Sequence, residues 1–176
     1  MATLDAVAEL KSDHAKVRDS LLELINIVEK GNAVKALEIL IRLDKLTGPH
    51  FRWEEESFYL ASEKFFGREY LEYLLSVHDR ILQRAKELAG ILGKGELTEE
   101  ERKKLPGILR MDVLSHPIEC EGVAIFAEKL SKRELAAMAK RLEECRKEDV
   151  PLLEWGDKIK DAERAKRGLK AKSRQG

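Results

Sequence analysis

The chain has 176 residues, enough for one domain with a substantial core and too few for two comfortable ones. Hydrophobic residues make up 43% of it and charged residues 38%, which excludes a disordered chain. Its 33 basic and 33 acidic residues balance, so net charge does not draw the whole protein to nucleic acid or membrane.

Signals for targeting and redox chemistry are few. Cys120 and Cys145 are the only cysteines, too few for a disulfide framework and without the CxxC spacing of a zinc finger. The first residues, MATLDAVAELKSD, include acidic side chains and no long apolar run, so we expect no signal peptide. No stretch approaches the roughly 20 apolar residues of a membrane span. We therefore predict a cytoplasmic protein that does not enter the membrane.

Two helices are predicted in the first part of the chain. Apolar residues recur at helical spacing over residues 4–29, and His14 takes one place in this stripe. A Gly-Asn pair ends the helix. A second helix begins near Ala33 and reaches about Lys64. A Thr-Gly-Pro run before His50 interrupts it, so the helix is either kinked there or restarted with the threonine as its cap.

Two more helices complete the predicted bundle. The third covers residues 68–92 and has His78 among its inward positions. The fourth begins either with a capping box at Thr98 or with Pro106 in its first turn. It carries His116 on its apolar face.

The C-terminal part is more charged than the rest. Residues 131–150 form a fifth predicted helix, which begins with capping-box spacing at Ser131. We predict an all-α protein with an up-down-up-down four-helix bundle over residues 1–130. A helical extension, residues 131–157, packs on the bundle. A basic tail, residues 158–176, is either a frayed helix or disordered.

Each predicted bundle helix carries one histidine, and the chain has no others. A single histidine on an apolar face is usually a hydrogen-bonded core residue. Four buried imidazoles without partners would together cost several kcal/mol, whereas one shared metal site would satisfy them all. Facing helices of a bundle commonly build metal sites in its core. The pattern therefore predicts a metal site at His14, His50, His78 and His116.

Glu54 adds a carboxylate to this site. It follows His50 by four residues in the run HFRWEEESFY, so both side chains lie on one helix face. The alternative is that Glu54, Glu55 and Glu56 form one acidic surface run. At about 100° per residue the second and third glutamates point to either side, so only Glu54 shares the face of the histidine.

These residues resemble the hemerythrin-like (HHE cation-binding) domain family over about residues 5–130. The resemblance rests on a histidine in the first helix, the HxxxE of the second, and a histidine in each of the third and fourth. It implies a four-helix bundle holding a non-haem di-iron centre bridged by two carboxylates. The metal ligands that it implies are His14, His50, Glu54, His78, His116 and Glu121.

The third helix departs from the family pattern. Hemerythrins that carry oxygen have an HxxxH there, whereas Leu74 and Leu82 lie four residues before and after His78. Asp79 or a water molecule could replace the missing imidazole, although Asp79 points about 100° away on a regular helix. We therefore expect a site that is poorer in ligands, more open, or occupied by one metal.

The fourth helix departs as well, in the run HPIECEG. Many relatives have a glutamate four residues after the histidine, where this chain has Cys120. Glu121 lies at the five-residue spacing that hemerythrin proper uses with an aspartate. A π-type widening at Pro117 would bring residues five apart onto one face. We favour Glu121 as the second bridging carboxylate and interpret Cys120 as a small buried hydrophobe.

Three functional hypotheses follow. The first is a protein that binds or senses oxygen, nitric oxide or iron and redox state; the resemblance favours iron, and the donors also suit zinc, manganese or nickel. The second is a di-iron enzyme acting on oxygen or peroxide or repairing iron centres. The third is a metal-free helical interaction module. Nucleic-acid binding is not expected, because no aromatic residues interleave the basic tail.

Overall fold

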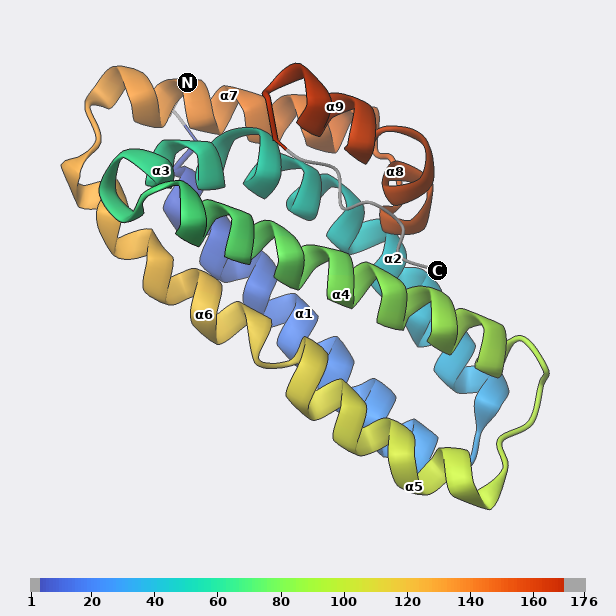
Figure 1. Ribbon diagram of the computed structural model, residues 1–176. Helices are drawn as coiled ribbons and strands as arrows, with labels where there is room; N and C mark the ends of the chain where they lie inside the picture. Colours follow the sequence, from blue (N-terminus) through green and yellow to red (C-terminus); the bar gives the residue numbers. More distant parts are fainter. Residues whose placement is uncertain (1–3, 170–176) are drawn as a thin grey trace.

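Four antiparallel helical rods form the bundle that the sequence predicts (Figure 1). The structure is a computed structural model that describes residues 4–169, and within that range it contains helices and turns but no strand. The rods are α1 (Ala6–Glu29), α2 (Ala33–Trp53), α4 (Arg68–Leu92) and the joined α5 (Glu99–Ile108) and α6 (His116–Val123). The predicted all-α bundle with additional C-terminal helices is confirmed.

Two predicted capping boxes mark where helices begin. The box at Thr98 starts α5, which runs through Pro106 instead of beginning there. The box at Ser131 starts α7 (Lys132–Glu148). In each box the hydroxyl and the glutamate three residues later satisfy backbone N–H groups that the first helical turn leaves unpaired.

The second rod is continuous through the Thr-Gly-Pro run, where the sequence left a kink or a restart open. Pro49 lies inside α2, and the hydroxyl of Thr47 donates to the carbonyl of Leu43 at 2.7 Å. The threonine is therefore not the cap of a new helix. The chain then widens into a π-helical turn, Glu54–Phe58, before α3 (Tyr59–Phe66). The wider turn changes which residues of the glutamate run face inward.

A second π-helical turn, Leu109–Val113, precedes His116 on the fourth rod. Pro117 lies in the first turn of α6, where its missing N–H has no intrahelical partner to lose. The widening expected at Pro117 thus occurs before the histidine, and His116–Val123 is a regular α-helix. A 3₁₀ segment, Ala124–Lys129, ends the rod.

The C-terminal extension packs closely against α2. Nε1 of Trp53 donates to the carbonyl of Met138 on α7 at 2.9 Å. A Cβ added at Gly48 would lie 2.1 Å from the carbonyl oxygen of Val150, in the connection that follows α7. Only glycine permits this approach, so the extension and the bundle share one packed interface.

Part of the predicted basic tail is helical. The chain continues from α7 into α8 (Leu152–Lys158) and α9 (Lys160–Lys166), which lie over the α2 side of the bundle (Figure 1). Within this tail, Arg164 of α9 is only 2% exposed and forms ion pairs inside the protein. Residues 170–176 lie outside the described range.

Three apolar clusters lie in the described part of the protein, and His14 and His50 lie between the two larger ones. On α1, His14 lies between Leu10 of one cluster and Val17 of the other. On α2, Leu43 and Trp53 flank the second histidine in the same way. The helices therefore bring their histidines to one level of the bundle, walled by hydrophobic side chains on both sides.

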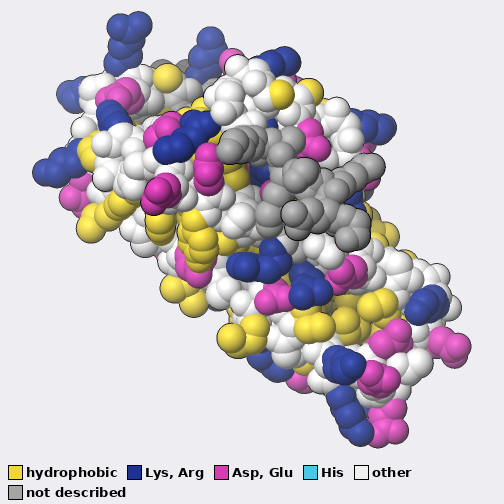
Figure 2. Space-filling view, in the orientation of Figure 1, with side chains coloured by type: hydrophobic (Ala, Val, Ile, Leu, Met, Phe, Trp, Pro, Cys, Tyr) yellow, Lys and Arg dark blue, Asp and Glu magenta, His cyan; other side chains and the backbone are white. Residues whose placement is uncertain are grey.

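The surface carries charges of both signs. Basic and acidic side chains intermingle on the face that Figure 2 shows, and none of the histidines is visible there. Each histidine is at most 4% exposed. Within residues 4–169, every helix is too short or too polar to cross a membrane.

Candidate metal centre

The four histidines converge on the carboxylate of Glu54. Nε2 of His50 lies 3.2 Å and Nε2 of His14 lies 3.6 Å from its Oε1. Nε2 of His78 lies 3.1 Å and Nε2 of His116 lies 3.7 Å from its Oε2. Each oxygen of the carboxylate therefore faces a separate pair of imidazoles.

Helix spacing and aromatic packing hold these groups in place. His50 and Glu54 lie one turn apart where α2 meets the π-helical turn, as their spacing in the sequence indicates. The ring of Phe51 stacks on that of His78 with centroids 4.0 Å apart and meets His116 edge-on at 5.4 Å. Such packing restricts the rotation of both imidazoles.

The fourth rod contributes Cys120 to the cluster and directs Glu121 outward. Sγ of Cys120 is fully buried and lies 2.7 Å from Oε1 of Glu54. Glu121, which the sequence favoured as the inward carboxylate, is 42% exposed and lies 3.5 Å from Nδ1 of His14, on the outer side of that ring. Because α6 is a regular α-helix, the residue four after His116 shares its face and the residue five after does not.

Burial and charge set the protonation of the cluster. Burial raises the pKa of Glu54, but the histidines, His50 above all, hold it well below its usual range. Burial lowers the pKa of His50, but Glu54 and Asp13 outweigh this and raise it to about 9. Burial lowers the pKa of His116 to about 4. Burial, with the Glu54 charge, raises the pKa of the Cys120 thiol well above its usual range. A cation that binds here must displace protons from the imidazole of His50 and the thiol of Cys120.

Two buried carboxylates lie behind the histidines, and the sequence did not single them out. Oε1 of Glu55 lies 3.0 Å from Nδ1 of His78, and Oδ2 of Asp13 lies 3.5 Å from Nδ1 of His50. Burial raises the pKa of Asp13, but its neighbours, first among them His50, hold it well below its usual range. A carboxylate on the outer nitrogen leaves Nε2 free to face inward as a ligand. The one feature of the sequence that could have indicated them is their position, because each carboxylate is adjacent in sequence to a predicted ligand.

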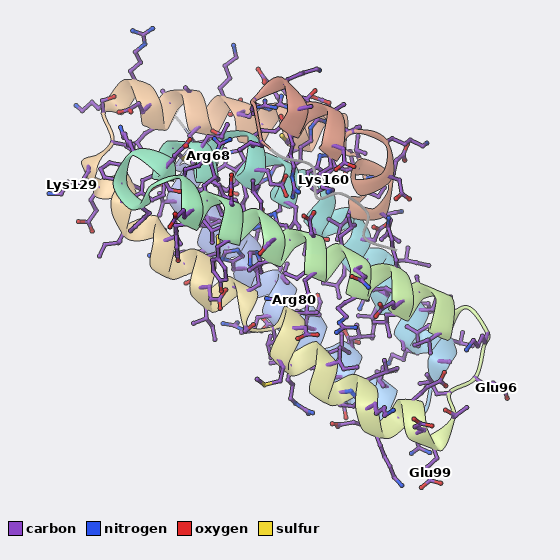
Figure 3. All side chains as sticks on the ribbon, viewed as in Figure 1. Arg68, Arg80, Glu96, Glu99, Lys129 and Lys160 are labelled. Carbon is purple, nitrogen blue, oxygen red and sulfur yellow. The ribbon has the colours of Figure 1, made fainter. Side chains whose placement is uncertain are left out.

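Tyr59 is another residue that the sequence did not single out. Its buried hydroxyl lies 3.0 Å from Nε2 of His78 and 3.6 Å from Sγ of Cys120. Asp79, considered from the sequence as a substitute ligand, instead accepts a hydrogen bond at 2.7 Å from Lys160. Lys160 is the labelled side chain of α9 in Figure 3. The tyrosine, and not Asp79, therefore joins Glu54 at the inner side of His78.

The donor set fits a metal cation. One donor atom from each of His14, Glu54, His116 and Cys120 lies within 4.8 Å of the others. Oε2 of Glu54 and Nε2 of His116 are buried without a hydrogen-bond partner, and an unsatisfied buried group costs about 1–3 kcal/mol. Both atoms face the cluster, so a bound cation would satisfy them.

Imidazoles from four helices around a buried carboxylate define a metal-binding helical bundle. The family model of the hemerythrin HHE cation binding domain matches residues 5–117. The chain therefore belongs to the hemerythrin HHE cation-binding family, and the resemblance drawn from its motifs is confirmed. Searches of curated proteins and of solved structures found no match.

Proposed function

We propose that the cluster would hold two iron ions, with Glu54 and the four histidines as donors. The supporting observation is that His14 and His50 face Oε1 of this carboxylate, whereas His78 and His116 face Oε2. A carboxylate between two pairs of imidazoles suits a bridged pair of cations. These donors suit zinc, manganese or nickel as well, and membership of the hemerythrin family favours iron.

Cys120 takes the place of a further donor in this proposal. Its sulfur lies 2.7 Å from Glu54, and a thiol loses its proton when it binds a cation. Glu121, the second bridge in the family pattern, supports His14 from its outer side instead. The proposed ligands are therefore His14, His50, Glu54, His78, His116 and Cys120.

The proposed activity is binding or sensing of a small diatomic ligand such as oxygen or nitric oxide. Iron held by imidazoles and a carboxylate supplies redox chemistry and open positions for such ligands. An apolar cavity of about 60 Å³ reaches the cluster, and its lining includes Phe51, Ile81, His116 and Pro117. Apolar walls favour a small uncharged molecule and disfavour ions, which would lose hydration there. This cavity favours a diatomic ligand over a charged one.

Metal analysis of protein expressed with iron tests the centre. We expect about two iron atoms per chain, as in other di-iron bundles. Glu54→Ala should lower the iron content, whereas Glu128→Ala, at an exposed carboxylate, should retain it. An iron content that stays below about one per chain and does not change in His50→Ala would contradict the proposal. A change in the visible spectrum on adding nitric oxide or oxygen to the reduced protein tests the ligand.

A di-iron enzyme acting on oxygen or peroxide is the second candidate, and Tyr59 favours it. The hydroxyl is a buried proton donor inside the cluster, between His78 and Cys120. Peroxide turnover that is lost in Tyr59→Phe, with iron content retained, would indicate an enzyme. Ligand binding without turnover would indicate a carrier or sensor.

A further inference from the structure

The C-terminal extension contacts the cluster through a buried arginine. Helices α7, α8 and α9 lie beyond residue 117, where the family match ends, and run along the α2 side of the bundle (Figure 1). Nε and Nη2 of Arg164 on α9 donate to the two oxygens of Glu55 at 2.7 and 2.6 Å. Glu55 in turn lies 3.0 Å from Nδ1 of His78. Arg164 is therefore connected to His78, a residue of the cluster, through the carboxylate of Glu55.

A second arginine makes the equivalent connection on the other side. Nη2 of Arg146 on α7 donates to Oδ2 of Asp13 at 2.8 Å, and that oxygen lies 3.5 Å from Nδ1 of His50. His50 faces Oε1 of Glu54, and His78 faces Oε2. One arginine of the extension thus stands behind each pair of imidazoles.

Both carboxylates depend on a cation. Asp13 is 4% exposed and Glu55 is 3% exposed, and a charge at that depth costs several kcal/mol unless it is paired. Glu55 lies within hydrogen-bond distance of Nδ1 of His78, at 3.0 Å, and Asp13 lies within ion-pair distance of Nδ1 of His50, at 3.5 Å. Both contacts are on the outer side of the ring and direct Nε2 toward the cluster. Removing the arginine would leave the buried carboxylate free to turn away, and the imidazole would lose this contact.

We propose that Arg146 and Arg164 are positioning residues of the metal centre. Through Asp13 and Glu55 they hold His50 and His78 with Nε2 toward the cluster, so the extension determines how tightly the bundle holds its metal. This inference rests on the proposed metal centre. It adds that the bundle requires the extension to bind metal at full strength.

Glu56 provides a matched control. Its side chain is 3% exposed and accepts hydrogen bonds from Arg52 at 2.9 Å and from Arg141 of α7 at 2.5 Å. Within the described residues, no histidine lies within ion-pair distance of this carboxylate. Arg141→Gln therefore removes an α7 arginine from a buried carboxylate without touching either connection to the cluster.

The experiment compares full-length wild type, Arg164→Gln, Arg146→Gln and Arg141→Gln. Affinity for Co(II) is measured by competition with a chelator, the visible spectrum of the bound Co(II) is recorded, and thermal unfolding is followed without metal. We expect Arg164→Gln to bind Co(II) about tenfold more weakly and with a shifted spectrum. Arg146→Gln should lose less affinity, because Lys16 still pairs with Asp13 at 2.9 Å. Arg141→Gln should match wild type in its Co(II) affinity and in its Co(II) spectrum. This should hold even if its unfolding temperature falls as much as that of Arg164→Gln. Arg164→Lys, which keeps the charge, should recover part of the affinity.

The outcomes separate this inference from the proposed function. Wild type that binds no metal would overturn both. Wild type that binds metal, with Arg164→Gln and Arg146→Gln no weaker than Arg141→Gln, would overturn the inference alone. If Arg164→Gln does not fold, Arg164→Lys decides, because it keeps a cation beside Glu55 and alters only the geometry of the pair.

Discussion

Glu54 has no exposed surface, and four imidazoles surround its carboxylate. A carboxylate at that depth is tolerated because a protonated imidazole, His50 with its pKa raised to about 9, balances its charge. A bound cation would take over that balancing role. The cluster therefore suits a cation that exchanges with protons, and binding should release protons to the buffer.

Cys120 and Glu121 are adjacent in sequence and should respond differently to substitution. Cys120→Ser replaces a thiol next to Glu54 with a hydroxyl, which is a weaker donor to transition metals. We expect its metal affinity to fall by about tenfold, in the range seen when groups at a metal site are altered. Glu121→Gln changes a half-exposed side chain and should alter affinity much less. Chelator competition measures the metal affinity of both variants. If Glu121→Gln lost more affinity than Cys120→Ser, Glu121 would be the better candidate for a metal ligand.

At the scale of elements, Gly48 on α2 decides how closely the extension can approach. An added Cβ would lie 2.1 Å from the carbonyl oxygen of Val150 and 2.6 Å from the backbone nitrogen of Leu152. Both atoms belong to backbone, so the connection between α7 and α8 would have to move. We expect Gly48→Ala to destabilise the protein by about 1–3 kcal/mol, the usual cost of overpacking. Thermal or urea unfolding measures this change.

Gly90→Ala is the control for this substitution. Gly90 lies in α4, and a Cβ there would meet no atom within 4 Å. The alanine should be neutral or stabilise the helix by up to about 1 kcal/mol. Equal effects of the two substitutions would contradict a special role for the contact at Gly48.

In the whole molecule, the candidate metal centre lies between the two larger apolar clusters and contains side chains from all four rods. A cation that binds the folded protein alone stabilises it by about 2.7 kcal/mol at a free concentration of 100 times its Kd. Chelation should therefore lower the unfolding temperature while leaving the helical content unchanged below the transition, because apolar packing forms most of the core. Circular dichroism with and without chelator measures this. An unchanged transition in protein shown to lose its metal would contradict it.

Sequence patterns predict the four rods, the convergence of their histidines and the His50–Glu54 pair. These features depend on helical periodicity, which relates residues three or four apart and can be read locally. The family match over residues 5–117 agrees with them. The same spacing rule places Cys120, four residues after His116, on the inward face of α6. The preference for Glu121 depends on a widened turn at Pro117, whereas the π-helical turn lies before His116.

The groups that support the histidines come together through long-range packing and are not predicted from sequence patterns. Asp13 meets Arg146, and Glu55 meets Arg164, across more than a hundred residues of chain. On a regular helix Glu55 points to the side of the face that His50 and Glu54 share, and Arg164 belongs to a basic tail, so helical spacing predicts neither as a buried residue. They are buried because each neutralises the other once α9 folds over the bundle, and that pairing depends on long-range packing, which helical spacing does not encode.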